Sequence, residues 1–454
     1  MSEKHFNDTL SYCSPAHGGW GIIRPCALIP GSYLLFVCPA ACFRHGSLGA
    51  IQHGFKNQIS FLYIDKADIV NGYDQVILDG IEELLEKVRT EIRVLFVYVS
   101  CLDDFIGTDV EKVLSKAGEK HPDILFRAGH MNPIASSTKL PPLVTTLHAM
   151  TSVLPAWKDS EQDDGVSFFG NFVEIPAESD VVSVLEGSGH PVRQLITSSS
   201  FEAYLEMSRS RTTLLTKPAS AYAVENLRKR TDITRFDMFV SYDTEIITEQ
   251  YIKLGELLGE DLLSPALPWK TEAETAIAEA LKAVKKQGAI CAEKTEIKEN
   301  AETAETAEIA EKAGNSGDAE EMLPVYISDS AVVFPFQLAL ALIRYGFNVR
   351  RVYAQQVAGP DKPYYVRLAA EHPEVEIIQS DHPLMHIRRT ERENAISIGE
   401  EAAYLTQSLH MVNLSEDEGM LGFYGVKRLM NMISESVGET ADIRKMIEEY
   451  GGIV

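Results

Sequence analysis

The sequence predicts an α/β protein made of three Rossmann-like, doubly wound parallel-sheet domains. Apolar runs of strand length alternate with segments that carry apolar residues at helical spacing, and this alternation recurs along the chain. A chain of 454 residues is also too long for a single core. We expect an N-terminal α/β domain over 1–160, a second over 161–290, an acidic linker over 291–322 and a C-terminal α/β domain over 323–454.

The first third of the chain has the order of a βαβ unit. The β-branched and aromatic run 93–100 is long enough for a buried parallel strand. We expect further strands over 60–65 and 124–127, and helices over 81–90 and 109–118. This order predicts a parallel sheet.

The same alternation continues in the middle of the chain and at its C-terminal end. In the middle, we expect a strand-like start near 165–172, an acidic helix over 180–186, a strand over 214–216, and helices over 222–230, 251–258 and 272–286. At the C-terminal end, we expect strands over 324–328, 348–353 and 375–378, and a helix over 332–345 that ends at Gly346.

Between these parts, the composition changes over residues 292–321. Glutamate recurs at every third position from 293 to 311, and the segment holds ten acidic residues against three lysines. A period of three forms no stable stripe on a helix with 3.6 residues per turn, and there is little apolar surface to bury. We therefore expect a solvated, mobile linker here.

Charge and cysteine usage exclude several classes of protein. A net charge of −24 argues against nucleic acid and anionic membranes as partners. The first residues do not resemble a signal peptide, and Pro30, Gly31 and Pro39 interrupt the apolar run 26–43, so we expect no membrane span. Six cysteines without a secretory context indicate thiols in a cytoplasmic protein. The sequence contains neither a Gly-rich dinucleotide motif nor a P-loop, so we expect no ATP site in this chain.

Three cysteines are the strongest candidates for chemistry. Cys13, Cys42 and Cys101 each lie beside an apolar run or a Gly/Pro turn, in what we expect to be separate loops. Thiolates from separate loops suit an iron–sulfur cluster, and gaps of 29 and 59 residues do not suit a zinc ribbon. The alternative, that they are small buried apolar residues, stays open at this point. Three cysteines also leave one iron without a ligand, to be supplied by a partner subunit, an aspartate, Cys26 or Cys38.

Four segments resemble the nitrogenase component 1 superfamily. The stretch from Cys101 to Asp109 fits the family pattern Cys-x-x-x-x-Ile-Gly-x-Asp in full. Weaker similarities lie at 13–19, which resembles a Cys-x-Pro-Leu-Gly-Ala turn, at 26–31, and at 37–42, where the family has His-Gly-Pro-x-Gly-Cys.

The resemblance implies an oxidoreductase subunit that works anaerobically with an iron–sulfur cluster, either [4Fe–4S] or P-cluster-like, on Cys13, Cys42 and Cys101. It also implies an ATP-hydrolysing iron protein as electron donor, and pairing with a homologous subunit or with a second copy, as a dimer or heterotetramer. Rival interpretations are a scaffold for assembly or transfer of a metallocofactor, and a regulatory binding protein that has lost the metal.

Two departures from the pattern argue against dinitrogen as the substrate. Residues 215–219 contain no cysteine where the catalytic nitrogenase subunit would offer one to its cofactor. His410 lies near the place of that subunit's cofactor histidine, but its neighbours do not match. We expect no iron–molybdenum cofactor.

Other polar residues have a structural interpretation beside a functional one. Asp109 and the run 328–330 suit helix caps, and the latter also suits an anion site. Pro383 makes a helical metal pair of His382 and His386 doubtful. Loop histidines near the cysteines are expected mostly at the surface: His17, His45 and His53.

Overall fold

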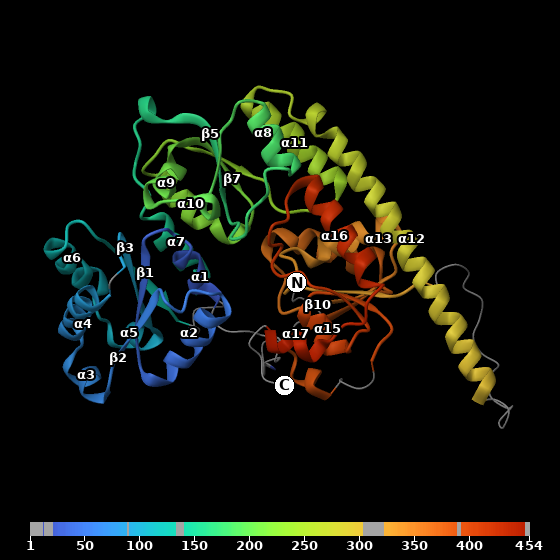
Figure 1. The fold of residues 1–454 in the computed structure, drawn as a ribbon, viewed down its shortest axis with the longest axis horizontal. Coiled ribbons are helices and arrows are strands. Elements are labelled where there is room, and N and C mark those ends of the chain that lie inside the picture. The colour runs from blue at the N-terminus through green and yellow to red at the C-terminus, as the bar shows by residue number, and fades with distance from the viewer. Residues whose placement is uncertain are drawn as a thin grey trace. The chain divides into compact units, whose positions relative to one another are not determined.

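The computed structural model describes residues 12, 21–88, 90–132, 140–302, 322–387 and 392–449. It contains three sheets, with strand orders β2-β1-β3-β4, β6-β5-β7-β8 and β11-β10-β9-β12-β13 (Figure 1). Every strand pairing in the described residues is parallel. The predicted fold class, three doubly wound parallel sheets, is confirmed. The chain forms two compact units, residues 18–176 with 185–239, and residues 1–17 with 177–184 and 240–454.

The first sheet is covered by helices on both faces. All residues of β1 and β3 are buried, as their continuous apolar sequences require. One face packs on α4 and α6, and the other on α1, α2 and α7. The strands are β1 (Ser32–Cys38), β2 (Ile59–Tyr63), β3 (Val94–Ser100) and β4 (Leu125–Met131). The helices are α1 (Arg24–Ala27), α2 (Ala40–Gln52), α3 (Lys66–Asn71), α4 (Asp74–Lys87), α5 (Cys101–Ile106), α6 (Val110–Lys120) and α7 (Pro142–Thr151).

The second sheet belongs to the same unit and shares an apolar cluster with the first. Phe169 of β5 and Leu215 of β7 lie in the cluster that also contains Phe36 and Phe96. The strands are β5 (Asp163–Phe169), β6 (Val192–Gln194), β7 (Ser210–Leu215) and β8 (Thr234–Asp237). The helices are α9 (Phe201–Leu205) and α10 (Ala221–Arg228), whereas α8 (Asp180–Gly187) begins in the segment 177–184, which belongs to the C-terminal unit.

The third sheet forms the core of the C-terminal unit. Gly346 ends α13 in the left-handed conformation (φ 96°), as the sequence predicts. The strands are β9 (Val325–Ser328), β10 (Val349–Ala354), β11 (Glu376–Gln379), β12 (Ile396–Ile398) and β13 (His410–Val412). The helices are α11 (Thr244–Leu258), α12 (Leu263–Glu302), α13 (Pro335–Tyr345), α14 (Lys362–Glu371), α15 (Glu400–Thr406), α16 (Gly422–Ser436) and α17 (Ile443–Glu449). Short 3₁₀ turns along the chain lie at Gly21–Ile23, Asp159–Glu161, Leu195–Thr197, Glu206–Arg209, Pro218–Ser220, Gly359–Asp361 and Pro383–Ile387.

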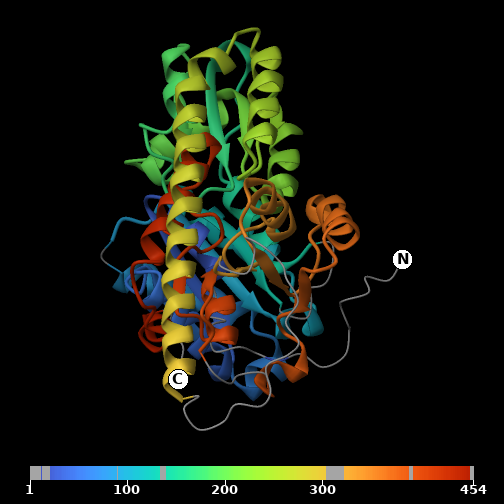
Figure 2. The ribbon, with the colours of Figure 1, turned by 90° about the vertical axis from the view of Figure 1, so that its right-hand side faces the viewer.

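Helix α12 corrects one expectation. It continues through residues 291–302, which we expected to begin the linker (Figures 1 and 2). Alanine, glutamate and lysine favour helix, and adding residues to an existing helix is far easier than nucleating a new one. The packed start of α12, with Ala273, Ala280 and Val284 buried, supplies that nucleus. Residues 303–321 of the expected linker lie outside the described residues. No helix in the described ranges is long and apolar enough to cross a membrane.

Asp180 anchors the segment 177–184 within the C-terminal unit. This fully buried carboxylate accepts hydrogen bonds from the backbone N–H groups of Phe423 (2.8 Å) and Tyr424 (2.9 Å) at the start of α16. It also accepts one from the Tyr251 hydroxyl (2.8 Å). Gly422 has a φ of +64°, and a Cβ there would lie 2.4 Å from the Asp180 carboxylate. The close approach therefore requires glycine.

Replacing Asp180 with alanine should lower the free energy of unfolding by about 3–5 kcal/mol, because two backbone donors and one hydroxyl would stay buried without an acceptor. The matched control is Asp261→Ala, since Asp261 is an exposed cap that accepts only from the start of α12 (Ser264 N–H, 3.0 Å) and should cost about 1 kcal/mol. Urea denaturation measures both variants. Equal losses for the two would contradict the anchoring role.

Candidate metal centre

The parallel pairing of β1 and β3 brings cysteines to one edge of the first sheet. Val37 of β1 pairs with Val99 of β3, so both strands end at the same level. Cys38 is the last residue of β1, and Cys42 lies four residues later in the first turn of α2. Cys101 directly follows β3 and begins α5. Two of the predicted ligands, Cys42 and Cys101, thus lie together at the carboxyl edge, and Cys38 lies with them.

The charges of these thiols influence one another. Burial raises the pKa of the Cys42 thiol, and repulsion from the Cys101 thiolate raises it further. Burial raises the pKa of Cys38 to about 12, with an added contribution from the charge of Cys42. Neighbouring thiolates without a compensating cation are unfavourable, and a bound metal ion reverses that penalty. The arrangement therefore suits a thiophilic metal.

The secondary structure around the cysteines differs from the expectation of separate loops. Cys42 and Cys101 lie in the first turns of α2 and α5, because each helix begins almost directly after its strand ends. The third predicted ligand, Cys13, lies outside the described residues, as does His17.

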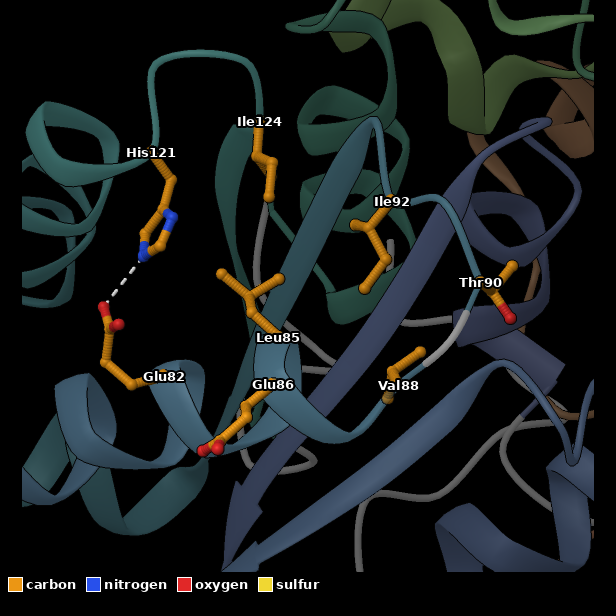
Figure 3. Close-up of a pocket in the computed structure, with 8 residues that line it drawn as sticks. All are labelled: Glu82, Leu85, Glu86, Val88, Thr90, Ile92, His121 and Ile124. Carbon is orange, nitrogen blue, oxygen red and sulfur yellow. Dashed lines mark hydrogen bonds and ion pairs between the residues drawn. The ribbon is translucent and has the colours of Figure 1, made fainter.

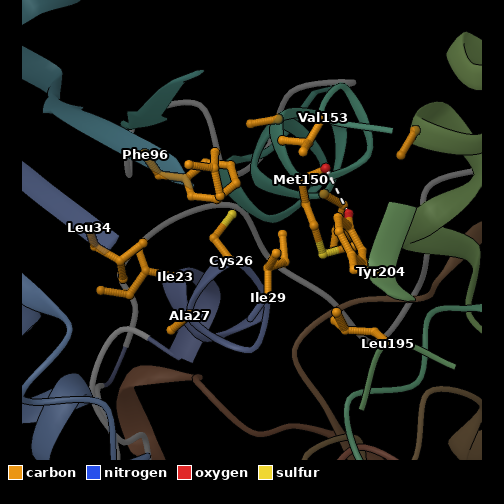
Figure 4. Close-up of a cluster of buried hydrophobic side chains, with 14 of the residues drawn as sticks. Ile23, Cys26, Ala27, Ile29, Leu34, Phe96, Met150, Val153, Leu195 and Tyr204 are labelled. Atoms are coloured by element: carbon orange, nitrogen blue, oxygen red, sulfur yellow. Dashed lines mark hydrogen bonds between the residues drawn. The ribbon is translucent and has the colours of Figure 1, made fainter. Parts of the chain in front are cut away.

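Cys26 is a packing residue in a different place. It is fully buried among Ile23, Phe96 and Met150 (Figure 4), and its thiol faces the Thr146 carbonyl oxygen at 3.9 Å. Burial raises its pKa to about 12, opposed by a hydrogen bond with Tyr98. This is the environment of an inert structural cysteine.

The Ile-Gly-x-Asp motif positions Cys101. Gly107 ends α5 in the left-handed conformation (φ 76°), and the Asp109 side chain caps α6 by accepting from the Lys112 N–H group (3.1 Å). The two residues form a tight turn between α5 and α6. Asp109 thus has the structural role of a helix cap.

A group of carboxylates and a histidine lies beside Cys101. Three residues, Asp103, Asp104 and His130, each offer one atom that could bind a metal ion, and these three atoms lie within 4.8 Å of one another. Asp103 is buried and accepts the Tyr73 hydroxyl at 2.6 Å, and burial raises its pKa. The sequence did not single out this group, because His130 lies on a different strand, β4, one residue before its end, and only the sheet brings it close.

The remaining histidines have structural or surface positions. His410 of β13 is buried, and its Nδ1 lies 3.0 Å and 2.8 Å from the carbonyl oxygens of Ser436 and Glu439. That nitrogen therefore donates to backbone. His45 is exposed on α2, and the ring of His53 stacks on Phe55.

Two further expectations are resolved at the third sheet. Residues 328–330 do not cap a helix, because α13 begins only at Pro335; their hydroxyls instead bond each other in the turn after β9 (Ser328 to Ser330, 2.9 Å). His382 precedes the 3₁₀ turn Pro383–Ile387, so it does not share a helical face with His386.

An open hollow of about 530 Å³ lies at the opposite, amino-terminal edge of the first sheet. Figure 3 shows the ion pair of His121 with Glu82 (2.9 Å) on one side and apolar side chains on the other. Ligands of parallel sheets bind at the carboxyl ends of the strands. This hollow is therefore not the candidate site. Its lining residues are Glu82, Leu85, Glu86, Val88, Thr90, Ile92, His121 and Ile124.

The third sheet carries buried carboxylates at its own carboxyl edge. Glu400 and Glu401 follow β12, next to β9, where the strand order changes direction. Burial raises the pKa of each to about 7; the nearby carboxylates of Glu416 and Asp329 raise that of Glu400 further, and Glu400 itself raises that of Glu401. These acids take up protons near neutral pH.

Comparison with known proteins decides the family. The model of the "Nitrogenase component 1 type Oxidoreductase" family matches residues 20–306. The chain belongs to this family.

The fold agrees with that of solved structures described as nitrogenase Cp1. The structure described as "Nitrogenase Cp1 at pH 6.5" superimposes with a TM-score of 0.69 and 12% identity, covering 95% of this chain and 94% of that chain. A second, "Nitrogenase Cp1 at pH 5", gives a TM-score of 0.58 and 14% identity, with 95% and 91% covered. No curated protein matches the sequence.

The buried acids predict a pH dependence of stability. The pKa of Glu400 is higher in the folded than in the unfolded protein, so the native state binds more protons between about pH 4.5 and pH 7 and loses stability as pH rises through that window. Glu400→Gln removes the charge and should raise the free energy of unfolding by about 1–3 kcal/mol at pH 8, with little change at pH 5.

Urea denaturation at both pH values measures this effect, with the exposed Glu279→Gln as control. A Glu400→Gln gain that is the same at pH 5 and pH 8 would show that the carboxyl group does not titrate in this window.

Proposed function

We propose that the chain is a nitrogenase component 1-like oxidoreductase subunit that holds an iron–sulfur cluster with Cys13, Cys42 and Cys101. An ATP-hydrolysing iron protein supplies its electrons, and the substrate is not dinitrogen. The observation that carries the proposal is the meeting of Cys42 and Cys101 at one edge of a parallel sheet.

The residues at this edge fit such a cluster. Thiolates are the ligands that iron–sulfur clusters require, and Cys42 and Cys101 are neither fully buried nor fully exposed. Cys42 also lies at the amino-terminal end of the 13-residue helix α2, whose free N–H groups favour negative charge. When bound, the cluster would supply transfer of low-potential electrons. The protein supplies the ligands, the partly dry surroundings and the stabilising dipole.

Two observations support a substrate other than dinitrogen. At the carboxyl end of β7, Thr216 donates its hydroxyl to the Phe169 carbonyl oxygen (3.1 Å), and no cysteine is present in residues 215–219. In the other unit, His410 uses one ring nitrogen on two backbone carbonyls within the core. The first place therefore offers no thiolate to an iron–molybdenum cofactor, and the Nδ1 of His410 is already engaged by the backbone.

Anaerobic purification of Cys42→Ala and Cys101→Ala tests the cluster. Both variants should lose most of their iron and acid-labile sulfide and the broad visible absorption of iron–thiolate bonds, because each removes a ligand. Cys26→Ala is the matched control, since it removes a cysteine from the packed core and should keep all three signals. Wild-type protein that is folded and free of iron even after reconstitution would refute the cluster.

A second measurement separates the enzyme from a cofactor scaffold. With a cognate iron protein and ATP, an enzyme gives many turnovers per cluster, whereas a scaffold releases its cluster once and stoichiometrically. Loss of cluster from the protein in step with product formation would contradict the enzymatic role.

A further inference from the structure

We propose that the carboxyl edge of the third sheet binds a hydrated divalent cation of the Mg²⁺ type, with the Glu400 carboxylate as its direct ligand. The neighbouring oxygen donors are Ser330, Asp329 and Glu416. These residues belong to the C-terminal unit, whereas the described cysteines of the candidate metal centre belong to the other unit. The inference therefore does not depend on the proposed cluster.

The site lies at the point where the strand order of the third sheet changes direction. Strand β9 is central, with β10 on one side and β12 on the other. Because Ile398 of β12 pairs with Ile327 of β9, the turns that follow these two strands leave the sheet at the same edge. In open parallel sheets, ligands bind in the crevice at this point, outside the carboxyl ends of the strands.

Three segments of the chain meet at Ser330, which follows β9. In the turn after β12, Gly399 lies so close that a Cβ on it would come within 3.1 Å of the Ser330 Oγ atom. In the loop after β13, the Glu416 N–H group donates to the Ser330 carbonyl oxygen (2.9 Å). Glu400 directly follows Gly399, and Asp329 directly precedes Ser330. The backbone therefore brings three acidic residues to one place.

The carboxylate of Glu400 is the feature that points to a ligand. Its side chain is buried (6% exposed), and in the described part of the chain its Oε2 atom has no hydrogen-bond partner. A buried carboxylate is costly unless it is paired, hydrogen-bonded or bound to a metal ion. A cation at this oxygen would supply both the missing partner and the compensating charge.

The chemistry of the donors favours a hard cation. All of them are oxygen atoms, namely the hydroxyl of Ser330 and the carboxylates of Glu400, Asp329 and Glu416. Carboxylate and water suit Mg²⁺ and Mn²⁺, whereas soft ions select thiolates. Within the described ranges, these carboxylates do not form a group of three whose oxygens all lie within 4.8 Å of one another. An ion that keeps several waters and binds one or two carboxylates, as Mg²⁺ usually does, fits this wider spacing.

Contacts around the site hold the donors in position. The Oδ2 atom of Asp329 accepts from the Gln355 N–H group (2.7 Å), directly after β10. Glu416 and Asp417 have φ values of 48° and 58°, which residues other than glycine seldom adopt. Asp417 supports this loop by accepting from the Val333 N–H group (2.7 Å). Glu416 is exposed and Asp329 is half-buried, so the group of donors is open to solvent on one side.

Titration of the chain with Mn²⁺ at pH 8, followed by the EPR signal of free Mn²⁺, tests the site. Wild type should bind about one Mn²⁺ ion per chain, and Mg²⁺ should displace it. Glu400→Gln keeps the shape of the side chain and removes its charge, so it should lose this binding. Unfolding would not explain the loss, because we expect this variant to be more stable than wild type at pH 8. The matched control is Glu279→Gln, which removes an exposed charge from α12 and should bind like wild type.

Two further variants locate the ion. Glu416→Gln should weaken Mn²⁺ binding about tenfold, because a carboxylate that holds a coordinated water acts through the second shell of the ion. Asp104→Asn removes a charge from the group of Asp103, Asp104 and His130 at the first sheet and should leave the affinity unchanged.

Equal Mn²⁺ affinities of wild type and Glu400→Gln would overturn the inference, as would the absence of binding to folded wild type. Binding that is lost in Asp104→Asn and retained in Glu400→Gln would assign the ion to the first sheet instead. Iron and acid-labile sulfide, measured on the same samples, report on the proposed cluster separately. Either proposal can therefore fail without the other.

Discussion

The parallel alignment of β1 with β3 is the constraint on which the candidate site depends. Both strands are buried along their whole length, so their backbone groups must pair within the sheet and their side chains must pack on both faces. A matched register then carries both chains to the same edge. Two cysteines 59 residues apart in sequence become neighbours there, because Cys42 follows the end of β1 closely and Cys101 follows the end of β3 directly.

Strong local patterns made much of this fold predictable. The run 93–100 is rich in β-branched and aromatic residues, and it forms β3 at almost the expected bounds. Helix α2 gave no such signal, because Gly46 and Gly49 resemble loop residues. The structure explains Gly46: a Cβ there would lie 3.0 Å from the Phe61 ring, so glycine serves close packing. A pattern read along one segment does not show what lies opposite it.

The roles of individual polar residues also depend on contacts between distant segments, which the sequence does not show. Cys26 and Cys38 were equivalent alternatives in the sequence, and only their surroundings in three dimensions distinguish them. In the same way, the sequence indicates only that Asp180 is an acidic residue at the start of a helix. Its hydrogen-bond partners, Tyr251 and Phe423, lie 71 and 243 residues away in the sequence. The linker prediction was wrong at 291–302 for a different reason. The sequence predicts a helix over 272–286, but the change in composition after it was interpreted as the end of that helix, whereas α12 continues to Glu302.

The motif that resembles the family most closely contains one candidate ligand and several structural residues. Gly107 adopts a conformation that side chains disfavour, and the Asp109 side chain caps α6 by accepting one backbone N–H group of its first turn. Together they fix the length and direction of α5, whose first residue is Cys101. A thiolate that must meet others from separate elements needs such fixed support, because a small displacement of one ligand weakens the whole site. The specificity of the motif therefore reflects the positioning of the metal ligand as much as the ligand itself.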